Sequence, residues 1–244
     1  MQPLYQRSPW IYPRKNYPFS ASSLENIDNF ENTKFRIALQ KNGELTDLSK
    51  KLISSFFGIK FPKAASLDRR LLMTVAGGEI CIFFAKNTDV CYLVDIGYVD
   101  SAVVGIDSIV EYKNSPGFKI IKDLSNYAKW PLVLATPTKS NIHKVSDIRA
   151  IVTQYPRLVR GLLDRSGMSK TKIIPVKGSC EGMVYLSSDI DAVVDLLVTG
   201  NTLKDNGLIA WDPPLIYLSP VVIANKNSLK DSKKKKYFDQ IYKN

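Results

Sequence analysis

Residues 191–208 read DAVVDLLVTGNTLKDNGL, and this stretch decides the fold class. The apolar residues on both sides of Asp195 predict a buried strand, and the letters TGNT at 199–202 predict a tight turn into a short helix. A buried strand that runs through a glycine-containing turn into a helix is typical of α/β proteins. The stretch therefore predicts an α/β fold with a binding loop at the end of one strand.

The loop at 199–202 has the groups that hold an anion. Free backbone N–H groups at a helix start, two hydroxyls and a glycine that permits close approach can surround a phosphate. Asp191 and Asp195 could hold ribose hydroxyls or a magnesium ion. An alternative remains open, because the same letters also fit a plain strand-to-helix turn capped by Thr202.

Strand-like and helix-like segments alternate on both sides of this stretch, which indicates mixed, largely parallel sheets. Strands are expected at 35–39, 80–84, 101–105, 131–136, 148–152, 172–176, 192–197 and 221–224, and helices at 45–56, 91–94, 158–163 and 229–242. The chain is expected to leave one lobe near residue 125 and to return late, with a cleft between two lobes. The expected parts are an irregular arm (1–33), lobe I (34–125), lobe II (126–220) and a return to lobe I with a C-terminal helix (221–244).

Composition excludes several classes of protein. The 244 residues are 45% hydrophobic, which excludes disorder for the bulk of the chain, and the longest apolar stretches are far shorter than the roughly 20 residues that span a bilayer. The one histidine, His143, excludes a histidine-rich metal site, and three cysteines without C-x-x-C spacing argue against a disulfide framework. We expect a cytoplasmic protein.

Charge favours anionic partners without choosing among them. The net charge is +11, and lysines crowd residues 230–243, where we expect a solvated helix face. Residues 1–33 combine prolines, aromatics and basic residues, which predicts an extended arm; organellar targeting by this arm stays open. Neither segment has a defined nucleic-acid motif, so nucleic acid is not an expected partner.

Four further stretches accompany the loop in a fixed order: RIALQKNG at 36–43, VDIGYVDSAVVGIDSIVE at 94–111, TQYP at 153–156 and GSCE at 178–181. Together the set resembles the ATP phosphoribosyltransferase family, the first enzyme of histidine biosynthesis, over residues 34–228. The resemblance implies a two-lobed fold like that of type II periplasmic binding proteins. It also implies that adenine N1 of ATP attacks the anomeric carbon of phosphoribosyl pyrophosphate and that pyrophosphate leaves, with Mg²⁺ as cofactor. Neither a histidine nor a cysteine is needed, because adenine N1 is itself a nucleophile.

The resemblance also implies roles for individual residues. By this resemblance Lys41 is expected to contact the polyphosphate and Glu181 to lie in the cleft wall. Both are the expected catalytic residues. The residues expected to bind phosphoribosyl pyrophosphate are Asp191, Asp195, Thr199, Gly200, Asn201 and Thr202. Those expected at the ATP side of the cleft are Asp100, Gly105 and Tyr155. Asp191 and Asp195 are also the expected Mg²⁺ ligands.

The family's long form has an added regulatory domain, whereas only a short tail follows Lys226 here. The chain therefore resembles the short form, which implies a separate regulatory subunit and a homo-oligomer.

Some residues depart from the family pattern. Glu44 stands where the family has an arginine, and Trp130 and Pro131 stand where the family has a second arginine. The stretch that follows Glu181, beginning at Gly182, also differs from the family pattern. These departures fall mainly on the ATP side, so a second hypothesis stays open: a divergent relative that keeps the phosphoribosyl site but uses another acceptor or only binds. A bilobal solute-binding protein would need an export signal, and none is readable.

Overall fold

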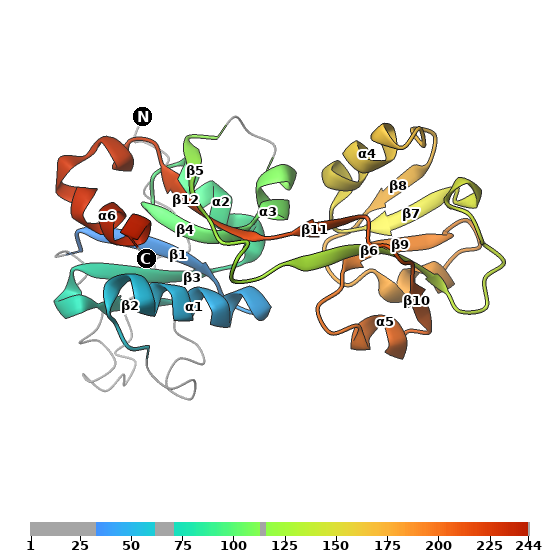
Figure 1. The fold of residues 1–244 in the computed structure, drawn as a ribbon, viewed down its shortest axis with the longest axis horizontal. Helices are drawn as coiled ribbons and strands as arrows, with labels where there is room; N and C mark the ends of the chain where they lie inside the picture. The colour runs from blue at the N-terminus through green and yellow to red at the C-terminus, as the bar shows by residue number, and fades with distance from the viewer. Residues whose placement is uncertain (1–32, 62–70, 113–115, 244) are drawn as a thin grey trace, which may run out of the picture.

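A computed structural model describes residues 33–61, 71–112 and 116–243. Two β-sheets lie side by side along the long axis, each with its own helices (Figure 1). We call the part built on the first sheet lobe I and the part built on the second sheet lobe II. The predicted arm, apart from Thr33, lies outside the described residues. Within the described ranges, no helix is long and apolar enough to cross a bilayer.

Lobe I holds a six-stranded sheet in the order β2-β3-β1-β4-β12-β5. Strand β1 pairs in parallel with β3 and β4, while β2, β12 and β5 pair antiparallel with their neighbours. Its elements are β1 (Phe35–Gln40), α1 (Glu44–Phe57), β2 (Leu72–Val75), β3 (Ile80–Ala85), α2 (Asn87–Asp95), β4 (Ser101–Gly105), α3 (Ile106–Glu111), β5 (Phe118–Asp123), β12 (Pro220–Asn225) and α6 (Lys235–Lys243), with short 3-10 turns at Ala76–Gly78, Ser228–Lys230 and Ser232–Lys234.

Lobe II holds the second sheet in the order β10-β6-β9-β7-β8, with β11 also paired to β6. Strand β7 is parallel to β8 and β9, and β6 is antiparallel to its three partners. Its elements are β6 (Trp130–Pro137), β7 (Ala150–Thr153), α4 (Pro156–Arg165), β8 (Lys172–Pro175), the 3-10 turn η7 (Glu181–Tyr185), β9 (Ala192–Leu196), α5 (Asn201–Asp205), β10 (Leu208–Ala210) and β11 (Ile216–Leu218), with a further 3-10 turn at Val145–Asp147.

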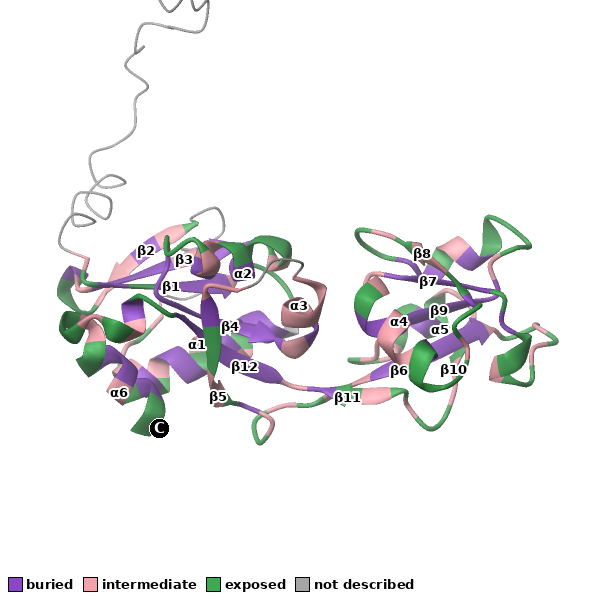
Figure 2. Cartoon of the chain, turned by 90° about the horizontal axis from the view of Figure 1, so that it is seen from above, coloured by how far each residue is buried: buried purple, intermediate pink, exposed green. Residues whose placement is uncertain are grey.

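Successive side chains of a strand point to opposite faces of its sheet, and in both sheets each face is covered by a hydrophobic core. In β1, Phe35, Ile37 and Leu39 pack against α1 and α6, while Ala38 packs on the other face with residues of α2. In β9, Val194 packs on the side of α4 and Val193 on the side of α5 and η7. Burial of strands on both faces explains their almost continuous apolar sequences (Figure 2).

The α/β class is confirmed, and the sheets are mixed. Parallel pairs lie at β3-β1-β4 and at β8-β7-β9, and antiparallel strands complete the rest of each sheet. The sequence did not predict β2, β5, β10 or β11, which are short or partly exposed. The chain passes between the sheets twice, from β5 to β6 and from β11 to β12, and Figure 1 shows β6 and β11 side by side across this passage.

The C-terminal segment belongs to lobe I. Helix α6 buries Tyr237, Phe238 and Ile241 in the core of this lobe, and Tyr237 stacks on Phe35 at 4.9 Å between ring centroids. Lysines of this segment lie on its exposed side, except that Lys234 is half-buried against Asp100 at 2.6 Å. The predicted solvated lysine face is thus largely what the structure shows.

Candidate functional site

A cavity of about 290 Å³ lies between the lobes. Lobe I lines it mainly from the ends of β1 and β4 and the starts of α1, α2 and α3; lobe II adds residues of β6, β9 and the start of α4. The lining residues are Gln40, Gly43, Leu45, Asn87, Gly105, Asp107, Ser108, Trp130, Tyr155, Leu196 and Val198. A neighbouring cavity of about 390 Å³ shares Asn87, Asp107, Ser108 and Tyr155. The two cavities are therefore neighbours, and we call them together the cleft.

The lobe I wall is built on Gly105 and Asp107, at the junction of β4 and α3. A Cβ atom on Gly105 would overlap Asp107 Oδ1, so only glycine lets the carboxylate fold back over this turn. Asp107 is buried, and burial raises its pKa. Gly105 was predicted at the cleft and lines it. Asp107 was not among the predicted site residues, although it ends the Gly-Ile-Asp letters of the family-like stretch.

The lobe II wall presents Tyr155, which lines both cavities. Pro156 at the first position of α4 leaves Tyr155 in a turn, where its N–H donates to Thr153 Oγ1 at 3.0 Å. Burial, with the carboxylates of Asp107 in lobe I and Asp195 in lobe II, raises the pKa of the phenol. Tyr155 is therefore a neutral hydroxyl between acidic groups of the two lobes.

The predicted anion loop follows β9 directly. Gly200 has a left-handed backbone (φ 76°) and is the N-cap of α5, and no side chain caps this helix. The alternative in which Thr202 caps the helix is therefore wrong. Side chains of Thr199, Asn201 and Thr202 are exposed, and the one contact of Thr199 within the loop is from Asn201 N–H to Oγ1 at 3.4 Å. The hydroxyls and N–H groups of the loop can thus meet a ligand.

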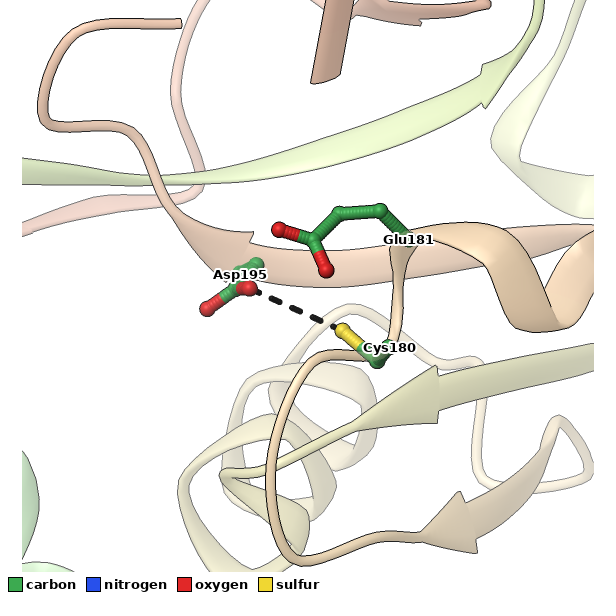
Figure 3. Close-up of side chains that lie close together, drawn as sticks. All are labelled: Cys180, Glu181 and Asp195. Carbon is green, nitrogen blue, oxygen red and sulfur yellow. Dashed lines mark hydrogen bonds between the residues drawn. The ribbon is translucent and has the colours of Figure 1, made fainter. Parts of the chain in front are cut away.

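Next to this loop, Asp195, Glu181 and Cys180 gather on one side of β9 (Figure 3). Their ligand atoms all lie within 4.8 Å of one another, and Cys180 Sγ donates to Asp195 Oδ2 at 3.6 Å. Burial, and then the charge of Glu181, raise the pKa of Asp195 to about 6, while the N–H of Leu196 opposes the shift by donating to Oδ1 at 2.8 Å. Burial also raises the pKa of the Cys180 thiol, so the free thiol is neutral.

Asp191 is separated from this group. It precedes β9 at the opposite end of the strand, where its carboxylate accepts hydrogen bonds from the N–H groups of Arg149 and Ala150 and pairs with the Arg149 guanidinium at 2.8 Å. These contacts lower its pKa against the opposing effect of desolvation. The sequence placed Asp191 with Asp195, but the structure gives it the task of joining β7 to β9.

Asp100 also lies away from the cleft. It is buried and accepts hydrogen bonds from Arg36 N–H at 2.8 Å, from Ser228 Oγ at 2.6 Å and from Lys234 Nζ at 2.6 Å. These contacts tie the C-terminal segment to β1 and β4. The structure therefore gives Asp100 an internal structural position instead of the predicted place in the cleft wall.

Lys41 follows β1 on the loop that leads to α1. Its backbone N–H donates to the Ala85 carbonyl at 2.8 Å, and its side chain is exposed. Its neighbours Gln40 and Gly43 line the cleft, so Lys41 stands at the rim of lobe I. Glu44, the departure from the family pattern, is the first residue of α1.

Comparison with known proteins identifies the family. A sequence model described as ATP phosphoribosyltransferase (HisG) matches residues 86–244. The ATP phosphoribosyltransferase of Clostridium novyi is 31% identical over 201 residues, covering 81% of this chain and 90% of that protein. The chain belongs to the ATP phosphoribosyltransferase family. The family predicted from the ordered motifs is thus confirmed, as is the enzyme class.

Other members and solved structures agree. The ATP phosphoribosyltransferase of Ruminiclostridium cellulolyticum is 31% identical, with 80% of this chain and 88% of that protein covered. A structure of the ATP phosphoribosyl transferase (HisG:HisZ) complex from Thermotoga maritima superposes with a TM-score of 0.62 at 23% identity, covering 86% of this chain and 97% of that chain. The alkanesulfonate-binding protein SsuA from Xanthomonas axonopodis pv. citri superposes with a TM-score of 0.55 at 14% identity, covering 85% of this chain and 70% of that chain. These likenesses confirm the periplasmic-binding-protein-like fold expected for an ATP phosphoribosyltransferase.

Proposed function

We propose that the cleft between the lobes is where this family member joins ATP to 5-phosphoribosyl 1-pyrophosphate. As an ATP phosphoribosyltransferase, the chain acts at the first step of histidine biosynthesis. The observation that supports the cleft as the binding place of phosphoribosyl pyrophosphate is the exposed loop at 199–202, which directly follows the strand that contains Asp195. That strand also supplies Leu196, which lines the cavity between the lobes.

The loop at 199–202 is the proposed seat of the ribose 5-phosphate. Its N–H groups at the start of α5 and the hydroxyls of Thr199 and Thr202 supply donors, and Gly200 leaves room for a phosphate against the backbone. Asp195 and Glu181 lie next to this loop, beside β9, and would accept hydrogen bonds from ribose hydroxyls. This arrangement holds the anomeric carbon toward the cleft.

The remaining cleft is the proposed place of ATP. Adenine N1 would attack the anomeric carbon while the bond to the pyrophosphate oxygen breaks, so positive charge develops on the sugar and negative charge on the leaving group. Lys41 at the rim would stabilise the polyphosphate. The protein mainly orients the two substrates and supplies a fixed electrostatic environment.

The family generally needs a divalent metal, and we propose Mg²⁺ held together with the pyrophosphate. The oxygen atoms of Asp195 and Glu181 suit a hard cation. Asp191 does not fit this task, because its carboxylate is already engaged by Arg149. When bound, the ion would neutralise charge on the leaving pyrophosphate.

A separate regulatory subunit is the proposed partner. The solved complex from Thermotoga maritima contains two kinds of chain, HisG and HisZ, and this chain covers 97% of the chain it matches there. We also propose that lobe I comprises residues 34–125 with 221–244 and lobe II residues 126–220, and that the chain forms a homo-oligomer in the cytoplasm.

The proposal is tested by mass spectrometry of products after incubating the pure chain with Mg²⁺, phosphoribosyl pyrophosphate and a mixture of ATP and other nucleobase acceptors. The reaction is run with and without a regulatory subunit. The expected product is phosphoribosyl-ATP, and Thr199→Val should weaken phosphoribosyl pyrophosphate binding in a folded protein. A product on another acceptor, or unchanged binding in the variant, would overturn the assignment.

A further inference from the structure

Three potential metal ligands converge beside β9 in lobe II. Cys180 lies just before η7, Glu181 begins it, and Asp195 comes from β9 fifteen residues later. Figure 3 shows the Glu181 carboxylate turned toward the space between Asp195 and Cys180. All three ligand atoms lie within 4.8 Å of one another, which is a separation that one ion can bridge after small side-chain rotations.

In the part of the chain that the structure describes, no basic side chain pairs with either carboxylate of this cluster. Glu181 is only 7% exposed, and among the described residues no hydrogen bond or ion pair involves its carboxylate. Asp195 receives one backbone N–H and one thiol. By contrast, the buried carboxylates of Asp100 and Asp191 are each paired with a basic side chain.

Two carboxylates that lie this close together repel each other, and partial burial strengthens the repulsion. A bound cation would remove this repulsion. The donor set then decides which cation. A thiolate prefers zinc-class ions, whereas Mg²⁺ prefers oxygen ligands alone.

We propose that Cys180, Glu181 and Asp195 bind one thiophilic divalent ion of the zinc class. Binding forms the metal–sulfur bond and releases the thiol proton to solvent, because the thiolate is the ligand. Three protein ligands leave a fourth position for water or substrate. Both the thiol and Glu181 are buried, so the ion would lie inside lobe II, beside the strand that reaches the cleft.

One consequence rests on the proposed function. Asp195 and Glu181 are the groups proposed to meet the ribose of phosphoribosyl pyrophosphate. A zinc-class ion that engages both carboxylates withdraws them from the sugar and from the Mg²⁺ proposed to bind them. The ion would then inhibit the enzyme in competition with phosphoribosyl pyrophosphate.

The first test is metal binding to the full-length, chelator-treated protein without substrates. Co²⁺ is titrated while thiolate-to-metal charge-transfer absorbance is followed in the near ultraviolet, and Zn²⁺ affinity is measured by calorimetry. Cys180→Ser is compared with Cys81→Ser, a matched control, because Cys81 is equally buried but lies in β3 of lobe I. Glu181→Gln is a second variant that keeps the thiol.

Wild type and Cys81→Ser should show the charge-transfer band, and Cys180→Ser should not. Zn²⁺ binding should weaken at least about tenfold in Cys180→Ser and in Glu181→Gln, since each loses a direct ligand. Thermal unfolding confirms that each variant is folded. A band that persists in Cys180→Ser, or wild-type Mg²⁺ binding as tight as Zn²⁺ binding, would overturn the proposal.

A second test separates this proposal from the proposed function. Zn²⁺ inhibition is measured with Mg²⁺, ATP and increasing phosphoribosyl pyrophosphate, and inhibition should be relieved as the sugar phosphate rises. If Zn²⁺ binds through Cys180 but phosphoribosyl pyrophosphate does not displace it, the metal site stands and the placement of the ribose at Asp195 is overturned.

Discussion

Asp191 and Asp195 lie at opposite ends of strand β9, about 13 Å apart along an extended chain, and only Asp195 lies at the end where the next residue, Leu196, lines the cleft. The Asp191 carboxylate is held by Arg149 and by two backbone N–H groups. Asp195 shares its surroundings with a second carboxylate and a thiol. Asp191 therefore stabilises the sheet, whereas Asp195 has no basic partner among the described residues.

Asp191→Ala should destabilise lobe II and leave the ligand site intact. Loss of the carboxylate leaves the N–H groups of Arg149 and Ala150 without their acceptor, which costs about 1–3 kcal/mol of unfolding free energy. Urea denaturation measures this loss. Phosphoribosyl pyrophosphate affinity, measured on the folded fraction, should stay within about twofold, since twofold is only about 0.4 kcal/mol; a tenfold loss would return Asp191 to the binding site.

Asp195→Asn should raise the stability of the protein and weaken its binding of phosphoribosyl pyrophosphate, the opposite of what is expected for Asp191→Ala. The pKa of Asp195 rises from 3.8 to about 6 on folding, so the folded state favours the protonated acid. The destabilisation by the ionised form is absent below about pH 4, grows as pH rises toward 6 and is complete above it. A shift of about two units corresponds to about 3 kcal/mol at most.

The metal-free Asp195→Asn variant should therefore be more stable than wild type at pH 7.5, and the gain should vanish near pH 4. Denaturant titrations at both pH values measure the difference. Phosphoribosyl pyrophosphate binding should weaken in the same variant. Equal stability at pH 7.5, or a gain that persists at pH 4, would contradict the raised pKa of Asp195.

Gly200→Ala tests the loop geometry. A left-handed backbone costs a residue with a Cβ about 1 kcal/mol, and the Cβ at this position would lie 3.3 Å from Leu197 Cδ1. The variant should lose phosphoribosyl pyrophosphate affinity. Gly167→Ala is the control, because Gly167 has nearly the same φ (74°) with nothing within 4 Å and follows the end of α4.

Calorimetric binding and thermal unfolding separate the two glycines. Both variants should unfold at slightly lower temperature, but only Gly200→Ala should lose affinity. Similar losses of affinity in both would show that general destabilisation, and not the loop, is responsible.

Gly105→Ala should disturb the cleft through Asp107. The backbone at Gly105 suits any residue (φ −71°), so the whole effect comes from overlap between the new methyl group and the Asp107 carboxylate. Overpacking of this kind costs about 1–3 kcal/mol. In a protein that already carries Asp107→Ala, the carboxylate is gone, so adding Gly105→Ala should cost little further unfolding free energy in denaturant titrations. An equal cost of Gly105→Ala with and without the Asp107 carboxylate would contradict the direct contact.

Apolar patterns along the chain predicted the central strands of both sheets. A strand that is buried on both faces has an almost continuous apolar sequence, as in Ala192–Leu196. The edge strands β10 and β11 were missed because short, partly exposed segments form strands only when β6 offers a partner. The same holds for Leu72–Val75, which pairs antiparallel with β3.

By itself, the sequence determined the α/β class and the loop at 199–202, because each is encoded by residues close together along the chain. It also determined the family, because several short motifs follow one another in a fixed order. Only the tertiary structure decided which carboxylates are free to act. Asp100 and Asp191 face basic groups brought from distant segments, whereas Asp195 meets Glu181 and Cys180, and Asp107 lies across the cleft from the lobe that carries Tyr155. A carboxylate's chemistry depends on what faces it through space, and that is fixed by folding and not by its neighbours in sequence.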